Sequence, residues 1–347
     1  MTAASRPARG DRGDGAGDRV AGAGDRGYPH GGGRDGASPP PADASPAHAA
    51  VELCGIRLRH PIVNASGTFD AIAARRVFGD ELVTRFPFSA FVSKTVTLAP
   101  RQGNAPPRLW ELPAGLINSI GLPNRGLDGY IEHDLPELAR LPVPLIVNVM
   151  GFHRDEVVRL VSELSARDEV AALELNVSCP NVETGLVMGA DPGETARLLD
   201  AVRPLTDKPL IVKLTPNASD VPAVALAAQR AGADAVSLIN TLRGMALHPA
   251  TGRPWLGGRT GGVSGPSVRA IALAQVDAVR AAVDIPIVAM GGVSSGRHAL
   301  DLIRAGATLV AVGTESFRDP AAGERIAAEL AAEQARVAPP RGRRDAG

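Results

Sequence analysis

The chain has 347 residues, 44% of them hydrophobic, with 37 basic and 37 acidic side chains. This size allows one barrel-sized domain or two smaller ones, and the zero net charge argues against a nucleic-acid partner or a polybasic membrane surface. Two cysteines argue against a disulfide framework, and the seven histidines form no HxxxH or HExxH metal motif. No run approaches 18 uncharged apolar residues, so we expect no transmembrane helix, no signal peptide and a cytoplasmic protein.

Residues 1–48 differ in composition from the rest of the chain. They consist mainly of Gly, Arg, Asp, Ala and Pro, with almost no large apolar side chains. Such a segment cannot bury enough surface to offset its ordering entropy, so we expect a disordered tail. Its arginines are interleaved with aspartates, which favours a solvated tail over a binding segment. Residues 337–347 have the same character, so 49–336 are expected to form the folded domain.

Eight short β-branched runs lie beyond the tail, each too short for a helix and too apolar for a half-exposed strand. They are PIVNAS (61–66), AFVSK (90–94), LIVNV (145–149), ALELNV (172–177), LIVKL (210–214), AVSLIN (235–240), IPIVAM (285–290) and LVAVG (309–313). Strands buried on both faces of a parallel sheet have this pattern. Helical segments lie between most of the runs, at 194–205, 221–232, 267–282 and 296–306. Ala-Gly-Ala at 231–233 and 305–307 indicates a left-handed glycine cap with a strand directly after it.

Buried strands that alternate with helices predict a (β/α)8 TIM barrel. The alternative, a doubly wound open sheet, would usually carry a glycine-rich turn after its first strand, and no GxGxxG is present. The active site of a barrel lies at the carboxyl ends of its strands. Two lysines, three asparagines and a cysteine come at the ends of the predicted strands: Lys94, Lys213, Asn148, Asn176, Asn240 and Cys179. An unpaired buried ammonium is costly, so two lysines at strand ends indicate a functional rim.

The last two predicted strands end in Gly291-Gly292 and Gly313-Thr314. Backbone N–H groups can approach a phosphate closely at such loops, and the N-terminus of the following helix favours an anion. In this fold a phosphate usually binds after strands seven and eight. Tight turns would explain either pair alone, but the two pairs together favour a phosphate site.

The segment LELNVSCPN (173–181) is similar to the Asn-x-Ser-Cys-Pro-Asn motif of class 1 dihydroorotate dehydrogenases. The similarity continues in order and spacing through SKTVT (93–97), NSIGLPN (118–124), IVNVMG (146–151), IVKLTPN (211–217), LINTLRG (238–244), GGVSGPSVR (261–269), AMGGVSS (289–295) and VGTE (312–315), and covers residues 51–330. The resemblance implies an FMN enzyme that oxidises dihydroorotate to orotate in pyrimidine biosynthesis. Cys179 would be the base that removes the C5 proton, which requires a thiol with a lowered pKa. Cys54 has no such setting and is expected to be a small apolar residue.

The resemblance also implies the remaining site residues. Around the substrate it places Lys94, Asn118, Ile120, Gly121, Leu122, Asn176, Asn181, Asn240 and Thr241, and asparagines suit orotate because they offer both donors and acceptors. Around FMN it places Ser66, Lys94, Thr95, Asn148, Asn176, Lys213, Ile239, Gly265, Gly291, Gly292, Gly313 and Thr314. Lys213 would stabilise the charge of reduced FMN, with a salt-bridged structural lysine as the alternative. Turn formation is the alternative for Asn118 and the preferred interpretation of Asn124.

The cysteine argues against the membrane-associated, quinone-using class, which has a serine base. The segments IGLPNRGLDGY (120–130) and RTGGVSGPS (259–267) resemble the 1B catalytic subunit more closely. That subunit pairs with an FAD and [2Fe-2S] partner that passes electrons to NAD, and this chain has neither a cysteine cluster nor a dinucleotide fingerprint of its own. We expect a homodimer, extended to a heterotetramer by such a partner. The fumarate-using 1A homodimer stays open, because residues 182–189 lack the double glycine expected of 1B.

Three other functions are less consistent with the residues. A dihydropyrimidine dehydrogenase domain shares the barrel, FMN and a cysteine, but tends to have histidine at the position of Asn181. A dihydrouridine synthase acts on RNA and would be expected to show basic patches. A non-catalytic flavin-binding barrel would be expected to have lost Cys179 or Lys94.

Overall fold

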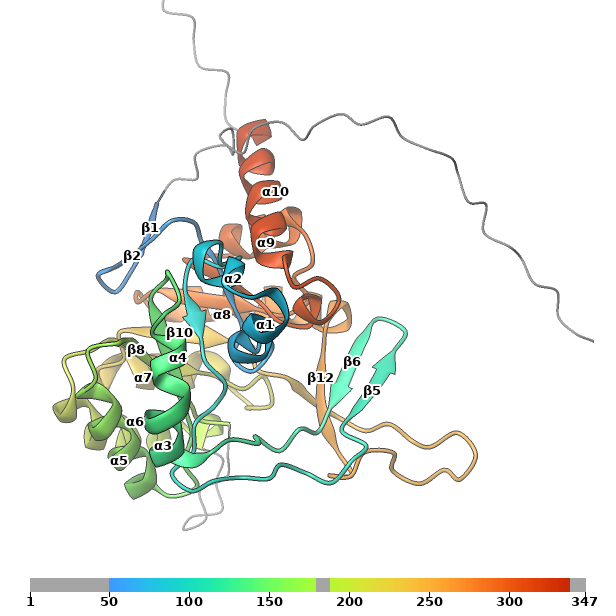
Figure 1. Cartoon of the computed structure of the whole chain (residues 1–347), viewed down its shortest axis with the longest axis horizontal. Coiled ribbons are helices and arrows are strands. Elements are labelled where there is room, and N and C mark those ends of the chain that lie inside the picture. Colours follow the sequence, from blue (N-terminus) through green and yellow to red (C-terminus); the bar gives the residue numbers. More distant parts are fainter. Residues whose placement is uncertain (1–49, 179–187, 338–347) are drawn as a thin grey trace, which may run out of the picture. The chain divides into compact units, whose positions relative to one another are not determined.

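The computed structural model describes residues 50–178 and 188–337 (Figure 1). The chain divides into two units, Met1–Ala44 and Ser45–Gly347, and every described residue belongs to the second. The segments expected to be disordered are residues 1–48 and 337–347. Residues 1–48 and 338–347 lie outside the described residues, so the expectation stays a prediction there, whereas Val337 is the last residue of a helix.

Eight parallel strands form the central sheet in the order β3–β14–β13–β10–β9–β8–β7–β4. They are β3 (Ile62–Asn64), β4 (Phe91–Val92), β7 (Leu145–Val149), β8 (Val170–Asn176), β9 (Leu210–Lys213), β10 (Ala235–Leu238), β13 (Ile287–Met290) and β14 (Leu309–Val312). Each coincides with one predicted run, and nearly all of their residues are buried. Burial on both faces is what a barrel covered by helices requires. The predicted (β/α)8 architecture is confirmed.

A side-chain amide joins the two end strands of this sheet, β3 and β4. Asn64 Oδ1 accepts a hydrogen bond from the Val92 backbone N–H at 2.8 Å, and Asn64 Nδ2 donates to the Val92 carbonyl at 2.8 Å. The Ser89 N–H also donates to the Ile62 carbonyl at 3.0 Å. Buried backbone groups need partners, and here Asn64 supplies to Val92 the bonds that a neighbouring strand would otherwise supply.

Helices come after most of the barrel strands (Figure 1). They are α1 (Ala71–Phe78), α2 (Glu81–Thr84), α3 (Gly126–Gly129), α4 (Leu135–Leu138), α5 (Arg154–Ser165), α6 (Pro192–Val202), α7 (Val221–Arg230), α8 (Arg269–Ala282), α9 (Gly296–Arg304) and α10 (Ala322–Val337). The predicted helices correspond to α6, α7, α8 and α9, although α8 starts two residues later because Pro266–Val268 form a 3₁₀ turn. Gly232 and Gly306 have φ of 93° and 108°, as the predicted glycine caps require.

The inside of the barrel is layered. Its lower layer is apolar and includes Ile146, Ala172, Ile211 and Ala235. The hairpin of β1 (Val51–Leu53) and β2 (Ile56–Leu58) adds Leu53 and Leu58 to the same cluster. Two residues further along the same four strands stand Asn148, Glu174, Lys213 and Ser237. Residues i and i+2 of a strand share a face, so these four form a polar layer nearer the carboxyl ends.

A second sheet, with the order β11–β12–β6–β5, was not predicted. Its strands are β5 (Leu109–Leu112), β6 (Gly115–Asn118), β11 (Leu242–Gly244) and β12 (Gly261–Ser264), all paired antiparallel. They belong to the connections after β4 and after β10, so they stand at the carboxyl ends of the barrel strands, and β5, β6 and β12 are seen beside the barrel in Figure 1.

Among the described residues, no helix is both long enough and apolar enough to span a bilayer.

Candidate active site

A cavity of about 590 Å³ lies at the carboxyl ends of the barrel strands, a size typical of small-molecule and cofactor sites. Most of the predicted site residues line it: Ser66, Lys94, Thr95, Asn118, Ile120, Leu122, Asn176, Lys213, Ile239, Asn240, Thr241, Gly265, Gly291, Gly292, Gly313 and Thr314. Gly121 and Asn148 are described but do not line it. Cys179 and Asn181 lie outside the described residues, so their part in the site stays a prediction. Residues far apart in the sequence are thus brought to one cavity.

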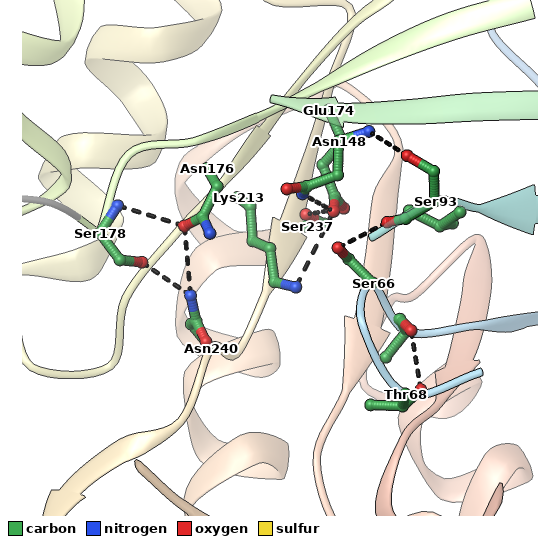
Figure 2. A network of polar contacts seen from close by, with 12 residues as sticks. Ser66, Thr68, Ser93, Asn148, Glu174, Asn176, Ser178, Lys213, Ser237 and Asn240 are labelled. Atoms are coloured by element: carbon green, nitrogen blue, oxygen red, sulfur yellow. Dashed lines mark hydrogen bonds and ion pairs between the residues drawn. The ribbon is translucent and has the colours of Figure 1, made fainter. Parts of the chain in front are cut away.

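Lys213 enters the cavity wall from the end of β9 and is backed by a buried carboxylate (Figure 2). Its Nζ lies 3.8 Å from Glu174 Oε1, and the two side chains are 7% and 4% exposed. At this separation the two groups form an ion pair without a direct hydrogen bond. Lys213 therefore lines the cavity and also has the carboxylate partner that the structural alternative required. Its stabilisation of reduced FMN stays a prediction.

Asn148 was expected to contact the flavin, but its side chain is fully buried beneath the cavity. The Nδ2 group of Asn148 donates a hydrogen bond to Glu174 Oε1 at 2.6 Å. Its Oδ1 has no hydrogen-bond partner among the described residues. The register of β7 and β8 pairs Asn148 with Glu174 directly, so the strand geometry turns the amide toward the carboxylate. Its contact with a flavin stays a prediction.

A cluster of amides and hydroxyls forms the part of the wall that comes after β8 and β10 (Figure 2). Asn240 Nδ2 donates to Ser178 Oγ at 2.8 Å and lies 3.3 Å from Asn176 Oδ1. The Thr241 backbone N–H donates to Asn240 Oδ1 at 2.8 Å. Ser178 directly precedes Cys179 in the sequence, so these bonds fix the chain immediately before the predicted base.

Asn118 and Asn124 have different surroundings. Asn118 ends β6, lines the cavity and donates from Nδ2 to the Gly262 carbonyl at 3.2 Å. Asn124 Oδ1 accepts from the Gly126 N–H at 2.8 Å, and the same residue bonds to Thr97. The turn-forming role preferred for Asn124 is confirmed.

Lys94 also lines the cavity and pairs with Asp70, a residue that the sequence did not single out. The Lys94 ammonium donates to Asp70 Oδ2, and both side chains are about half exposed. Asp70 also caps α1 by accepting from the Ala73 N–H at 3.0 Å. Burial alone would raise the pKa of the Asp70 carboxyl, but the hydrogen bonds from Lys94 and Ala73, with the positive charges of Lys94 and Arg76, hold it below its ordinary value.

Glycines form the wall after β13 and before α8. Gly265, Gly291 and Gly292 have φ of 90°, 130° and 70°, which other residues rarely adopt. A Cβ on Gly292 would lie 2.6 Å from Arg269 Cβ, and one on Gly265 would lie 2.8 Å from Gly115 Cα. Thr314, after β14, donates from Oγ1 to Ser264 Oγ at 2.9 Å, which ties this loop to β12. The two predicted glycine loops follow the neighbouring strands β13 and β14, and both line the cavity.

Among the polar residues of the site, Asp70 and Glu174 were not singled out in the sequence, and Ser178 was given no role of its own. Glu174 had a usable signal, since it is a charged residue inside an otherwise apolar buried strand. Asp70 only resembles a helix cap, and Ser178 was read as part of the cysteine motif.

The structure offers no group of three or more His, Cys, Asp or Glu side chains within residues 50–178 and 188–337 that could hold a metal ion.

Comparison with known proteins agrees with the site. The family described as dihydroorotate dehydrogenase matches residues 48–333. A protein of Trichlorobacter lovleyi, named dihydroorotate dehydrogenase B (NAD(+)), catalytic subunit, is 46% identical over 282 residues, which are 80% of this chain and 90% of that protein. Proteins of the same name from Desulforudis audaxviator and Geobacter metallireducens are each 45% identical over 285 residues, or 81% of this chain and 91% of theirs. The resemblance drawn from the motifs is confirmed, and the chain belongs to the dihydroorotate dehydrogenase family.

Proposed function

We propose that this chain is the catalytic subunit of a class 1B dihydroorotate dehydrogenase, which binds FMN and oxidises dihydroorotate to orotate in pyrimidine biosynthesis. The observation that carries the proposal is the single cavity at the strand ends. It joins the glycine loops, the buried Lys213 and the Asn176–Asn240 cluster, and it lies beside the segment that leads to Cys179. The matching relatives carry the name of this activity.

The described residues fit FMN in size and chemistry. The loops at Gly291-Gly292 and Gly313-Thr314 both line the cavity after neighbouring strands, and their backbone N–H groups and the start of α9 suit a phosphate. Lys213 offers a positive charge in the cavity wall, and Asn148 Oδ1, which has no hydrogen-bond partner among the described residues, lies behind that wall. When bound, FMN would supply the acceptor for the hydride from C6 of dihydroorotate. Ser66, Thr95, Ile239 and Gly265 would complete its surroundings.

On the substrate side, the asparagines match the alternating N–H and C=O groups of the dihydroorotate ring. Asn118, Asn176 and Asn240 line the cavity and offer both donors and acceptors. Lys94 would attract the substrate carboxylate, with Ile120, Gly121, Leu122, Asn181 and Thr241 assisting. Cys179 would take the proton from C5 as a thiolate, and Ser178, held by Asn240, would fix the start of its loop. Proton and hydride then leave opposite faces of the ring.

The electrons need an acceptor outside this chain. The relatives' names include NAD(+) and the words catalytic subunit. We therefore infer that this chain associates with an FAD and [2Fe-2S] subunit. We further propose that the chain forms a homodimer and acts in the cytoplasm. Fumarate reduction by the chain alone would instead indicate the 1A type.

The test is anaerobic mixing of the FMN-loaded protein with dihydroorotate, with flavin absorbance recorded in a stopped-flow instrument. The proposal predicts rapid bleaching in the wild type. In Cys179→Ser bleaching should be slowed by about 100-fold or more near neutral pH, because general-base catalysis contributes that much. A protein that binds FMN and stays oxidised with dihydroorotate contradicts the proposal.

A further inference from the structure

The polar layer beneath the cavity is built by four neighbouring strands (Figure 2). Asn148 comes from β7, Glu174 from β8, Lys213 from β9 and Ser237 from β10. Asn148, Ser237 and Glu174 are 0%, 0% and 3% exposed, and none of the three lines the cavity. Only Lys213 belongs to the cavity wall. Of the layer, Lys213 would therefore be the residue that contacts a bound flavin, and the Glu174 carboxylate is its partner behind the cavity wall.

Glu174 is held without help from the lysine. Its Oε1 accepts from Asn148 Nδ2 at 2.6 Å, and its Oε2 accepts from Ser237 Oγ at 2.8 Å. Both oxygens are satisfied by neutral donors on the flanking strands. The Lys213 ammonium lies 3.8 Å from Oε1, outside hydrogen-bond distance. Lys213 therefore keeps its N–H donors for the cavity, while its charge is partly offset by the carboxylate.

The consequence is electrostatic. A positive charge beside a flavin stabilises the negatively charged reduced form and so makes the flavin more oxidising. A negative charge placed a few ångströms behind that positive charge weakens the effect, strongly so where water is excluded. The size of the combined effect depends on both partners, because Glu174 also fixes where the ammonium stands.

We propose that Glu174 is a positioning residue that anchors the Lys213 ammonium at the cavity floor and offsets part of its charge, which keeps the reduction potential of the bound flavin lower than Lys213 alone would set it. This inference rests on the proposed function. A flavin that takes a hydride from dihydroorotate must also release electrons to NAD, which is a weak oxidant. Lys213 favours reduction of the flavin by dihydroorotate, and Glu174 keeps the flavin potential low enough for the electrons to pass on to NAD.

The test measures the midpoint potential of the bound FMN against reference dyes in four proteins: wild type, Glu174→Gln, Lys213→Gln and the double variant. Glu174→Gln keeps the size of the side chain but removes its charge. The glutamine oxygen can still accept from Asn148 Nδ2, and its amide N–H can donate to Ser237 Oγ, because a hydroxyl can accept as well as donate. We expect it to shift the flavin equilibrium about tenfold toward the reduced form, a rise of about 30 mV for a two-electron couple. Lys213→Gln should lower the potential, and in that background Glu174→Gln should produce less than half of its rise.

Two further variants control for packing. Ser237→Ala removes one hydrogen bond to the carboxylate but keeps the charge, so its potential should stay near that of the wild type. Glu174→Asp keeps the charge in a shorter side chain, so its potential should fall between those of wild type and Glu174→Gln, and it serves as the test if Glu174→Gln fails to fold.

Three results would overturn the inference. The first is an unchanged or lowered flavin potential in Glu174→Gln, or in Glu174→Asp if Glu174→Gln does not fold. The second is an equal shift by Glu174→Gln in the wild-type and Lys213→Gln backgrounds, and the third is a shift in Ser237→Ala as large as that in Glu174→Gln. FMN affinity is measured separately by fluorescence titration. A wild-type protein that does not bind FMN contradicts the proposed function itself, which separates the two failures.

Discussion

Replacement of Asn64 by leucine tests how the barrel closes. Asn64 is fully buried, and its amide donates to and accepts from the backbone of Val92 at 2.8 Å in both directions. Leucine has a similar size but no hydrogen-bonding atoms. The substitution therefore leaves the Val92 N–H and carbonyl without these partners inside the seam between β3 and β4.

The expected loss comes from the desolvation of two buried backbone groups. Each unsatisfied group costs about 1–3 kcal/mol, so Asn64→Leu should lower the free energy of unfolding by about 2–6 kcal/mol. Against a typical total of about 5–15 kcal/mol this is a large fraction. At ~2 °C per kcal/mol for a large domain, the melting temperature should fall by roughly 4–12 °C.

The measurement is urea unfolding monitored by circular dichroism, with calorimetry for the melting temperature. Asn217→Ala is the matched control, because the exposed Asn217 amide also donates to a hydroxyl and a carbonyl, those of Thr215 and Thr241, where water can replace it. If Asn64→Leu falls within about 1 kcal/mol of this control, the Asn64 amide does not close the seam between β3 and β4.

Three further predictions rest on single contacts. Asp70→Asn keeps the α1 cap but removes the carboxylate. Since the pKa of Asp70 is lowered in the fold, the wild type should lose up to ~1 kcal/mol of stability as the pH falls from about 4 through the folded pKa, whereas the variant should not. Urea unfolding at pH 7 and pH 3 measures this, and identical midpoints for the two proteins at both pH values would refute the pairing with Lys94. Burial, with the charges of Asp234 and Glu52, raises the pKa of the Cys54 thiol to about 11. Because only the thiolate reacts, alkylation of Cys54 at pH 8, followed by peptide mass spectrometry, should be about 100-fold slower than that of a free cysteine. Equal rates would contradict this prediction. Gly292→Ala places a Cβ at a φ of 70° and 2.6 Å from Arg269 Cβ, so fluorescence titration should show FMN binding weakened about tenfold, and unchanged affinity would mean that this loop does not hold the cofactor.

The barrel was predictable because of how its strands are buried. A strand covered on both faces consists of consecutive apolar residues, and runs such as LIVNV (145–149) and LIVKL (210–214) stand out from the polar segments around them. Alanine- and leucine-rich helices between the runs completed the (β/α)8 pattern. The glycine caps at Gly232 and Gly306 marked where these helices end.

The antiparallel sheet beside the site could not be predicted in the same way. Its strands have three or four residues, and β12 (GGVS) and β11 (LRG) are glycine-bearing and only partly buried. Such segments carry neither the alternation of a half-exposed strand nor the apolar run of a buried one. Their pairing depends on contacts between connections that are far apart in the sequence, after β4 and after β10.

The motifs located the candidate site in the sequence, but the contacts within the polar layer beneath it became visible only in the folded barrel. Lys213 and Asn148 were noticed as polar residues at strand ends, but their shared partner Glu174 was read as part of a strand. The pairing of β7 with β8, and of β8 with β9, brings the three side chains together inside the barrel. Such contacts depend on sheet register, which residue types at strand ends do not reveal.

The most direct test of the proposed activity is a comparison of substrates under anaerobic conditions. The FMN-loaded protein is titrated with dihydroorotate and, separately, with dihydrouracil, and flavin absorbance and product are measured together. We predict that each equivalent of dihydroorotate reduces one equivalent of FMN and yields one equivalent of orotate, while dihydrouracil leaves the flavin oxidised. Reduction by dihydrouracil without reduction by dihydroorotate would contradict the proposed activity and place this chain among dihydropyrimidine-oxidising enzymes.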